Sequence, residues 1–136
     1  MEPIEVAGCV LLDDYGRILL LHRDLGEIGQ WELPGGKVEE GETPEQAAGR
    51  ELGEELGVTV RIGRALGSEV FEQADKQYRF YWFKADIITG EPSIMEPDIF
   101  DDLDYFEIED LVSLSLSTNM QIMYQKIFDG SLQLDA

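Results

Sequence analysis

One segment, residues 35–58 (GGKVEEGETPEQAAGRELGEELGV), limits most strongly what this chain can fold into. Thr43 is a favourable N-cap and Pro44 suits the first helical position, while Gln46 stands where a capping box needs Glu or Gln. Gly57 supplies the left-handed residue that commonly ends a helix. The segment therefore predicts a glycine-rich turn followed by a helix over residues 44–56.

Three carboxylates share one face of this predicted helix, because Glu51, Glu54 and Glu55 are spaced i, i+3 and i+4. Like charges at this spacing destabilise an isolated helix by about 0.2–0.5 kcal/mol per pair, and Arg50 can offset Glu54 but not all three. One interpretation is an acidic face that lies in water. The other is a site for Mg²⁺ or Mn²⁺, which prefer hard oxygen ligands.

The surrounding residues favour the metal site. Residues 36–58 resemble the Nudix box at each of its defined positions, which are Gly36, Glu42, Arg50, Glu51, Leu52, Glu54, Glu55, Gly57 and Val58. The resemblance implies the α/β Nudix fold, an α/β/α sandwich with a mixed β-sheet between helices and the box helix against one face. At 136 residues the chain is expected to form a single domain over residues 1–136.

The composition narrows the possible partners and compartment. A formal net charge of −19 argues against nucleic acid and anionic membranes as partners, since these need clustered Lys and Arg. No apolar run approaches the length of a membrane span, and the N-terminus lacks the basic and apolar regions of a signal peptide. A cytoplasmic location is therefore expected. Cys9 is the only cysteine, and its apolar surroundings favour a core position over a reactive thiol.

The remaining segments predict a strand-rich chain. Apolar runs predict strands over residues 4–12 and 17–23, joined as a hairpin, and then a loop over 24–30. Residues 58–73 predict one or two strands. Residues 77–88 predict an aromatic strand, on which alternation places Tyr78, Phe80 and Trp82 on the same face. Such a face could stack on a nucleobase, although core packing is the simpler expectation.

The C-terminal third combines acidic loops with a last helix. Residues 90–110 are rich in acids and proline and predict mostly loop, with a short strand at Tyr105-Phe106. Residues 111–128 are expected to end in an amphipathic helix. Within the box helix, Gly49 and Gly53 line one strip, which indicates either close packing against the sheet or a weak helix.

The resemblance also implies which residues form the metal site. The metal ligands would be the Gly35 carbonyl, Glu51, Glu54, Glu55 and Glu96, with Asp98 or Asp101 as alternatives to Glu96. Either Glu51 or Glu54 would act as the general base. By the same resemblance, Glu42 and Arg50 pair and brace the loop against the helix.

Three further residues are candidates for substrate binding. Arg23 lies where the family places a substrate contact, and a surface charge is the alternative. Lys37 could meet a phosphate or could pair with Glu39 or Glu40. Asn119 lies where MutT enzymes carry a base-recognising Asn, and a helix cap is the alternative.

The resemblance implies a Mg²⁺-dependent hydrolase of nucleoside diphosphate derivatives, with Mn²⁺ as an alternative ion. The favoured substrate is a nucleoside triphosphate, including oxidised dGTP, cleaved to the monophosphate and pyrophosphate. The alternatives are hydrolysis of ADP-ribose, dinucleotides or nucleotide sugars, and a nucleotide-sensing domain without turnover. A homodimer is left open.

Overall fold

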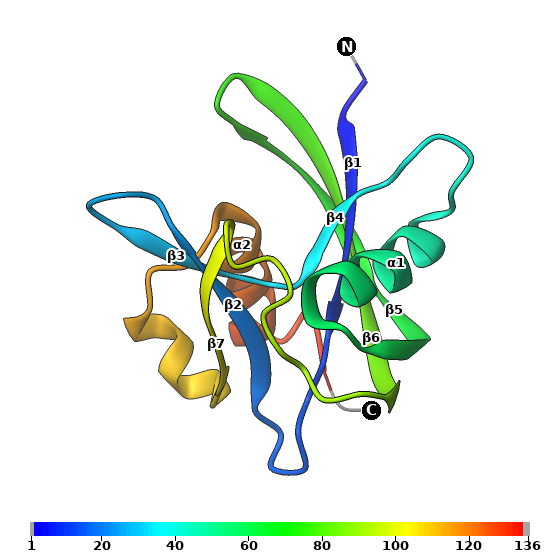
Figure 1. Cartoon of the computed structure of the whole chain (residues 1–136). Helices are drawn as coiled ribbons and strands as arrows, with labels where there is room; N and C mark the ends of the chain where they lie inside the picture. The colour runs from blue at the N-terminus through cyan, green and yellow to red at the C-terminus, as the bar shows by residue number, and fades with distance from the viewer. Residues whose placement is uncertain (1, 135–136) are drawn as a thin grey trace.

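Two β-sheets form the framework of the structure, a computed structural model that describes residues 2–134 (Figure 1). The first sheet has the order β4-β1-β6-β5, and it is mixed because β1 runs parallel to β6 while its other pairs are antiparallel. Its strands are β1 (Ile4–Val10), β4 (Gly35–Lys37), β5 (Thr59–Gln73) and β6 (Lys76–Thr89). The second sheet is antiparallel in the order β3-β2-β7, formed by β2 (Ile18–Asp24), β3 (Gly29–Glu32) and β7 (Phe100–Phe106).

Helices cover both faces of these sheets. Side chains of β1, β2 and β6 alternate between two cores, one shared with α1 (Pro44–Leu56) and the other with α2 (Thr118–Phe128). A 3-10 helix, η1 (Ile108–Ser113), joins the second core through buried Leu111. The α/β/α sandwich with a mixed sheet between helices is therefore confirmed.

The box helix α1 has the predicted bounds. Its capping box is complete, since the Thr43 hydroxyl accepts from the Gln46 N–H at 3.1 Å and the Gln46 side chain accepts from the Thr43 N–H at 3.0 Å. Gly57 ends the helix in the left-handed region with φ of 71°. The buried face of the helix consists of Ala47, Ala48, Leu52, Glu55 and Leu56.

The apolar run over residues 4–12 lies between the two cores, as its sequence predicted, but the expected hairpin is wrong. Strand β1 pairs with β4 and β6, whereas β2 pairs with β3 and β7. Only the turn keeps hairpin contacts, through a bridge between Leu12 and Ile18 and a bond from the Leu19 N–H to the Leu11 carbonyl at 3.0 Å. Strand β1 lies between two strands of the first sheet, and β2 lies between two strands of the second. The chain therefore crosses from one sheet to the other at this turn. Cys9 is fully buried in the first core, and burial raises the pKa of its thiol to about 12.

The chain between the box helix and the acidic segment forms one long hairpin. Residues 59–73 are a single strand, β5, which turns through Ala74 and Asp75 into β6 and projects beyond the rest of its sheet (Figure 1). Both turn residues have positive φ, 52° and 64°, as expected for a tight hairpin turn. Phe80 and Trp82 share one core while Phe83 lies in the other, which confirms the predicted alternation.

Two other expectations need correction, and one open alternative is decided. Of the seven residues of β7, only Tyr105 and Phe106 were predicted as strand, while the rest lie in the segment predicted as loop. The predicted loop over 24–30 already includes the start of β3. The helix glycines do not pack closely. A Cβ at Gly49 would meet nothing within 4 Å, and one at Gly53 would lie 3.7 Å from the Val58 carbonyl oxygen. Within residues 2–134, no helix has both the length and the apolar character needed to cross a membrane.

Candidate active site

Arg50 ties the loop before α1 to the helix itself. Its Nε and Nη2 donate to the two carboxylate oxygens of Glu42 at 2.8 and 3.0 Å, and Nη2 also donates to the Lys37 carbonyl at 3.0 Å. The hydrogen bond to Arg50 lowers the pKa of Glu42. The structure thus brings the predicted pair together and fixes the end of β4 against the helix.

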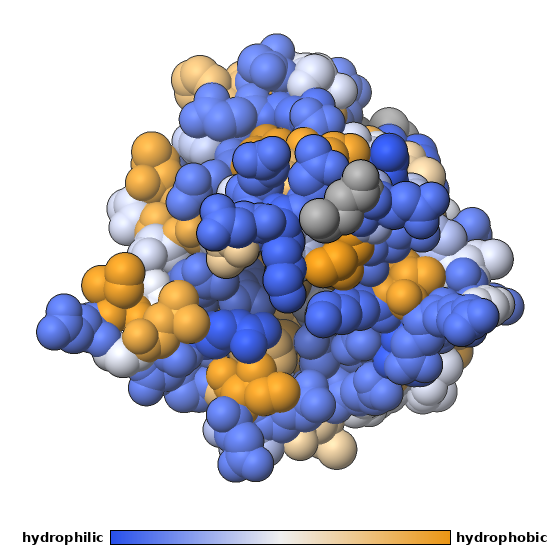
Figure 2. Space-filling model, turned by 90° about the horizontal axis from the view of Figure 1, so that it is seen from above, coloured by the Kyte–Doolittle hydropathy of each residue, from blue (hydrophilic) through white to orange (hydrophobic). Residues whose placement is uncertain are grey.

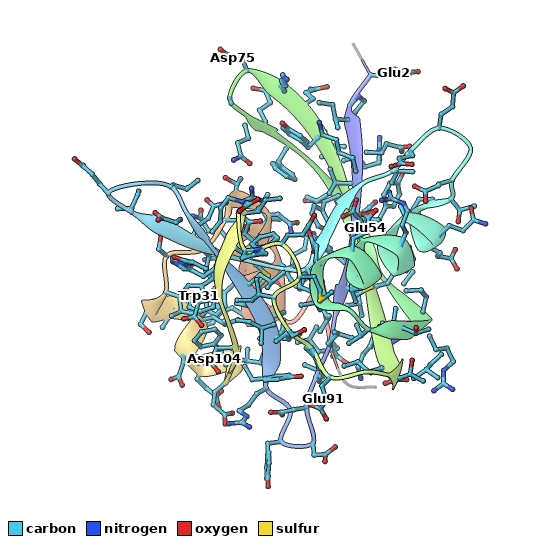
Figure 3. The ribbon with its side chains drawn as sticks, viewed as in Figure 1. Glu2, Trp31, Glu54, Asp75, Glu91 and Asp104 are labelled. Atoms are coloured by element: carbon cyan, nitrogen blue, oxygen red, sulfur yellow. The ribbon has the colours of Figure 1, made fainter. Side chains whose placement is uncertain are left out.

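The same guanidinium reaches two of the helix carboxylates. Its Nη1 donates to Glu51 and to Glu54, each at 3.0 Å. Glu54 is half exposed beside β4 (Figure 3), whereas the Glu51 side chain is only 16% exposed. Burial raises the pKa of Glu51 despite the bond from Arg50. Glu54 is therefore accessible to water, and Glu51 is held in a drier position.

Glu55 is the buried member of the carboxylate set. It is 6% exposed and accepts a hydrogen bond from the Gly35 N–H at 2.8 Å. Burial raises its pKa to about 9, and the negative charges of Glu51, Glu96 and Glu32 add to the effect. The Gly35 backbone and Glu55 thus lie side by side, in a position where an added positive charge would be favourable.

Gly36 leaves the room that this arrangement needs. A Cβ at this position would lie 2.3 Å from the carboxyl carbon of Glu51. A larger residue here would force the Glu51 carboxylate out of its present position. This contact gives a physical reason for the glycine at the first position of the box.

Glu96 is carried to the site by a loop that is bonded to the end of α1. The Ser93 N–H donates to the Leu56 carbonyl and the Met95 N–H to the Glu55 carbonyl, both at 3.1 Å. The charge of Glu96 contributes to raising the pKa of both Glu51 and Glu55, as expected for a neighbouring carboxylate.

The two alternatives to Glu96 lie differently. Asp98 is exposed to solvent, and Asp101 accepts a hydrogen bond from, or donates one to, Nδ1 of His22 at 2.6 Å. Asp101 is therefore engaged with β2, while Glu96 is the acidic residue of the loop whose charge acts on Glu51 and Glu55.

The donor set fits a hard divalent ion by its chemistry, although the carboxylates do not converge on one point. Within residues 2–134, no three acidic, histidine or cysteine side chains converge at metal-binding spacing. Arg50 Nη1 donates to both Glu51 and Glu54. Four carboxylates and a backbone carbonyl are nevertheless the oxygen ligands that Mg²⁺ and Mn²⁺ prefer.

A cleft of about 360 Å³ adjoins this acidic region and contains the three predicted substrate-binding residues, Arg23, Lys37 and Asn119. Gly35 and Gly36 form part of its wall, and these two residues lie next to Glu55 and Glu51. Its remaining lining residues are Val6, Leu25, Gln30, Glu32, Leu33, Phe71, Gln73, Tyr78, Phe80 and Ser117. Within the described residues, Lys37 forms no ion pair with Glu39 or Glu40. The side chain of Lys37 is therefore available to a ligand.

Asn119 is a buried amide whose orientation is fixed. Its Oδ1 accepts a hydrogen bond from Trp82 Nε1 at 2.7 Å, and the residue is 7% exposed. Because indole nitrogen can only donate, the oxygen must face Trp82, which leaves the Nδ2 amino group for a ligand in the cleft. The alternative of a helix cap is wrong, since Ser117 caps α2 by accepting from the Met120 N–H at 3.2 Å.

The fold and the box geometry agree with three comparisons. The NUDIX domain family profile matches residues 2–127. The chain belongs to the Nudix family. It is 38% identical to the 8-oxo-dGTP diphosphatase of Haemophilus influenzae over 96 residues, which cover 65% of this chain and 67% of that protein. It is 43% identical to the CTP pyrophosphohydrolase of Escherichia coli over 70 residues, covering 50% of this chain and 51% of that protein.

A solved structure extends the likeness over the whole fold. The crystal structure of a MutT NUDIX hydrolase from Burkholderia pseudomallei is 33% identical to this chain and superposes with a TM-score of 0.79, covering 93% of this chain and 99% of that one. The chain is thus a MutT-like Nudix hydrolase, an enzyme of the pyrophosphohydrolase type. Nudix hydrolases generally use divalent metal ions.

This Nudix cleft also contains polar residues that the sequence did not single out. Arg23 donates to Glu32 from Nε at 2.6 Å and from Nη2 at 3.1 Å, and Gln30 Nε2 donates to the same carboxylate at 2.6 Å. The register of β2 and β3 places Arg23 opposite Gln30, with Glu32 two residues further along the same face. Gln30 and Glu32 are two residues apart, so in a strand their side chains point to the same face. The sequence could have predicted this only if residues 29–32 had been recognised as a strand.

Proposed function

We propose that this chain is a Mg²⁺-dependent hydrolase that cleaves a nucleoside triphosphate to the monophosphate and pyrophosphate, with an oxidised purine such as 8-oxo-dGTP as the first candidate. The observation that carries the proposal is that the cleft adjoins the carboxylates. The buried Asn119 amide lies in the same cavity as Gly35 and Gly36, whose backbones contact Glu55 and Glu51. A nucleotide whose base approaches Asn119 could extend its phosphates toward the carboxylates.

The carboxylates would act in two ways. We assign Glu51, Glu54, Glu55 and Glu96, with the Gly35 carbonyl, as the groups that would hold the ion. When bound, a divalent ion offsets phosphate charge and lowers the pKa of a coordinated water. Glu54 or Glu51 would then take the proton of the attacking water. Glu54 is the more accessible of the two at 50% exposure, and Arg50 orients both.

Cationic and amide groups of the cleft would bind the rest of the substrate. Lys37 is exposed at the end of β4 and can meet a phosphate. Arg23 is fixed by Glu32, and its Nη1 forms no hydrogen bond within residues 2–134. The fixed Nδ2 of Asn119 would donate to an acceptor on the base. We also propose that the whole chain is one domain, since the family match spans nearly all of it.

A cytidine triphosphate is a second candidate, favoured by the 43% identity to a protein named CTP pyrophosphohydrolase. A cytosine also presents an acceptor for the Asn119 amino group, so the amide alone does not choose between the bases. ADP-ribose, dinucleotides and nucleotide sugars remain alternative substrates. A sensing domain without turnover is disfavoured, because every defined acid of the box is present.

The test is hydrolysis of a panel with Mg²⁺. The panel contains the dNTPs, 8-oxo-dGTP, CTP, ADP-ribose, dinucleotides and a nucleotide sugar, and released phosphate is measured after addition of pyrophosphatase or phosphatase. Pyrophosphate from a triphosphate supports the proposal. Turnover of the other compounds alone would contradict the substrate class, and binding without any turnover would contradict hydrolysis.

Substitution of Glu54 tests the roles within the site. We expect Glu54→Gln to lower kcat by about 10²–10³, by analogy with the loss of one group that stabilises a transition state. Glu45→Gln is the matched control, since Glu45 is an exposed acid in the first turn of the same helix. Circular dichroism would show that both variants are folded. A folded Glu54→Gln enzyme with wild-type kcat and wild-type metal affinity would contradict the assigned role.

A further inference from the structure

Gln30 presents one polar atom to the cleft whose direction is set by its neighbours. Its Nε2 donates to Glu32 Oε2 at 2.6 Å. A carboxylate can only accept, so the amide must turn its nitrogen to Glu32 and its oxygen away. No donor among residues 2–134 bonds to that oxygen, and Gln30 lines the cleft. The Oε1 atom is thus an oriented acceptor with no protein partner.

Arg23 fixes the position of the Glu32 carboxylate, and this carboxylate fixes the orientation of the Gln30 amide. Two guanidinium nitrogens of Arg23 bond the two carboxylate oxygens, and the guanidinium also lies over the Phe100 ring at 5.0 Å. The Glu32 side chain is only 16% exposed, so water competes weakly for these bonds. Rotation of the Gln30 amide would place its oxygen against a carboxylate and break a charge-assisted hydrogen bond.

The cleft therefore offers two fixed and opposite polar groups. Asn119 presents an amino donor because its oxygen is bonded to Trp82, and Gln30 presents a carbonyl acceptor because its nitrogen is bonded to Glu32. Both residues line the same cavity, whose other lining residues include the apolar Leu33 and Phe80. A planar ligand with an acceptor and an N–H donor on its edge would satisfy both groups.

We propose that Gln30 is a specificity-determining residue whose Oε1 accepts a hydrogen bond from an amino group on the edge of the bound nucleobase. The inference rests on the proposed function, since it requires a nucleotide in this cleft, and it names the part of the base that is read. A base without that amino group leaves the Gln30 oxygen unpaired in a partly dry cleft, which costs binding free energy.

Pairs of nucleotides that differ only in one amino group test this role. The probes are GMP against IMP, AMP against purine riboside monophosphate, and CMP against pyrimidin-2-one riboside monophosphate. Dissociation constants are measured by calorimetry without metal, on the full chain. The phosphate is the same within each pair. A substitution that acts only by disturbing Arg23 or Glu32 would therefore change the dissociation constants of both nucleotides by the same factor.

We expect the amino-bearing member of at least one pair to bind wild type about three- to tenfold more tightly, the value of one hydrogen bond. Gln30→Met should abolish that difference, and Gln30→Thr, which suits a strand, provides a second variant without the amide. Gln77→Met is the matched control, because Gln77 is an exposed strand residue outside the cleft. It should keep the wild-type difference.

Two results would overturn the proposal while leaving hydrolysis intact. One is a wild-type enzyme that binds the nucleotides but distinguishes no pair. The other is a difference that survives in a folded Gln30 variant. If none of the monophosphates binds and no triphosphate of the panel is hydrolysed, the proposed function itself fails, and the role of Gln30 fails with it.

Discussion

Arg50 is the residue on which the box geometry depends most. One guanidinium contacts Glu42, Glu51, Glu54 and the Lys37 carbonyl at distances of 2.8–3.0 Å. A planar fork with five donors can make such a set of contacts, whereas a Lys ammonium cannot. The same side chain therefore shapes the loop before α1 and restrains two carboxylates that carry the proposed chemistry.

The Glu42–Arg50 pair should make stability depend on pH. Arg50 lowers the folded-state pKa of Glu42 below its ordinary value of 4.5, so the pair stabilises the fold above that value. The stabilisation should disappear as the pH falls through the lowered pKa. We expect Glu42→Gln to reduce the urea midpoint at pH 7 and to reduce it less at pH 3.

The comparison of wild type with Glu42→Gln isolates this one group, because a protonated Glu resembles Gln. Glu40→Gln, which changes an exposed acid of the loop before the helix, serves as the control and should follow wild type at both pH values. A wild-type advantage of equal size at pH 3 and pH 7 would show that the carboxylate charge of Glu42 does not contribute.

At the scale of elements, α1 carries glycines that its packing does not require. A Cβ at Gly49 would meet no atom within 4 Å, and one at Gly53 would make only an ordinary contact at 3.7 Å. Each Gly→Ala change in a helix interior gains about 0.5–1 kcal/mol, chiefly through the smaller entropy loss of Ala on folding. We expect Gly49→Ala and Gly53→Ala each to raise the urea midpoint with no change in slope.

Gly57 provides the opposite control on the same helix. Its φ of 71° suits glycine, and a Cβ there would lie 3.1 Å from the Met95 sulfur. Gly57→Ala should therefore destabilise the protein. If Gly49→Ala and Gly53→Ala also lower the midpoint, close packing of these two positions, one of the two alternatives drawn from the sequence, would be the better description.

The elements differ in how far sequence alone could predict them, and the difference has a physical cause. The ends of α1 depend on local capping by Thr43 and Gly57, so its bounds were predicted. The partners of β1 and β2 depend on which apolar faces meet across the whole chain, and no local pattern records that choice. Strand β7 was predicted only at its end, Tyr105-Phe106, because its acidic residues lie on an exposed edge, where strand patterns are weak.

In the candidate site too, features set by local sequence were predictable and features set by long-range contacts were not. The proximity of Glu51, Glu54 and Glu55 follows from helix periodicity alone. The meeting of Arg23 with Asn119 in one cleft came from the family resemblance, because these residues lie on separate elements. The oriented oxygen of Gln30 was missed, since its segment was predicted as loop.

At the scale of the whole molecule, negative charge dominates the surface. The net charge is −19, and the face seen in Figure 2 is mostly hydrophilic with small separate apolar groups. Part of this charge protects β7, which pairs only with β2 and leaves its other edge open within the described residues. Exposed Asp102 and Asp104 on that strand (Asp104 is labelled in Figure 3) discourage pairing with a strand of another molecule.

Such an excess of one sign should make the fold more stable as salt is added. Raising NaCl from 0.01 M to 0.15 M shortens the screening length from about 30 Å to about 8 Å. Screening weakens the ion pairs of Arg50 as well as the repulsion among acids, but 29 acidic residues face only 10 basic ones, so relief of repulsion should dominate. We expect the thermal midpoint to rise across this range.

The double variant Asp102→Asn, Asp104→Asn keeps both side-chain acceptors for the Leu103 and Tyr105 N–H groups while removing two charges, and it should show a smaller rise. A midpoint that falls with salt in wild type would mean that the ion pairs outweigh the repulsion.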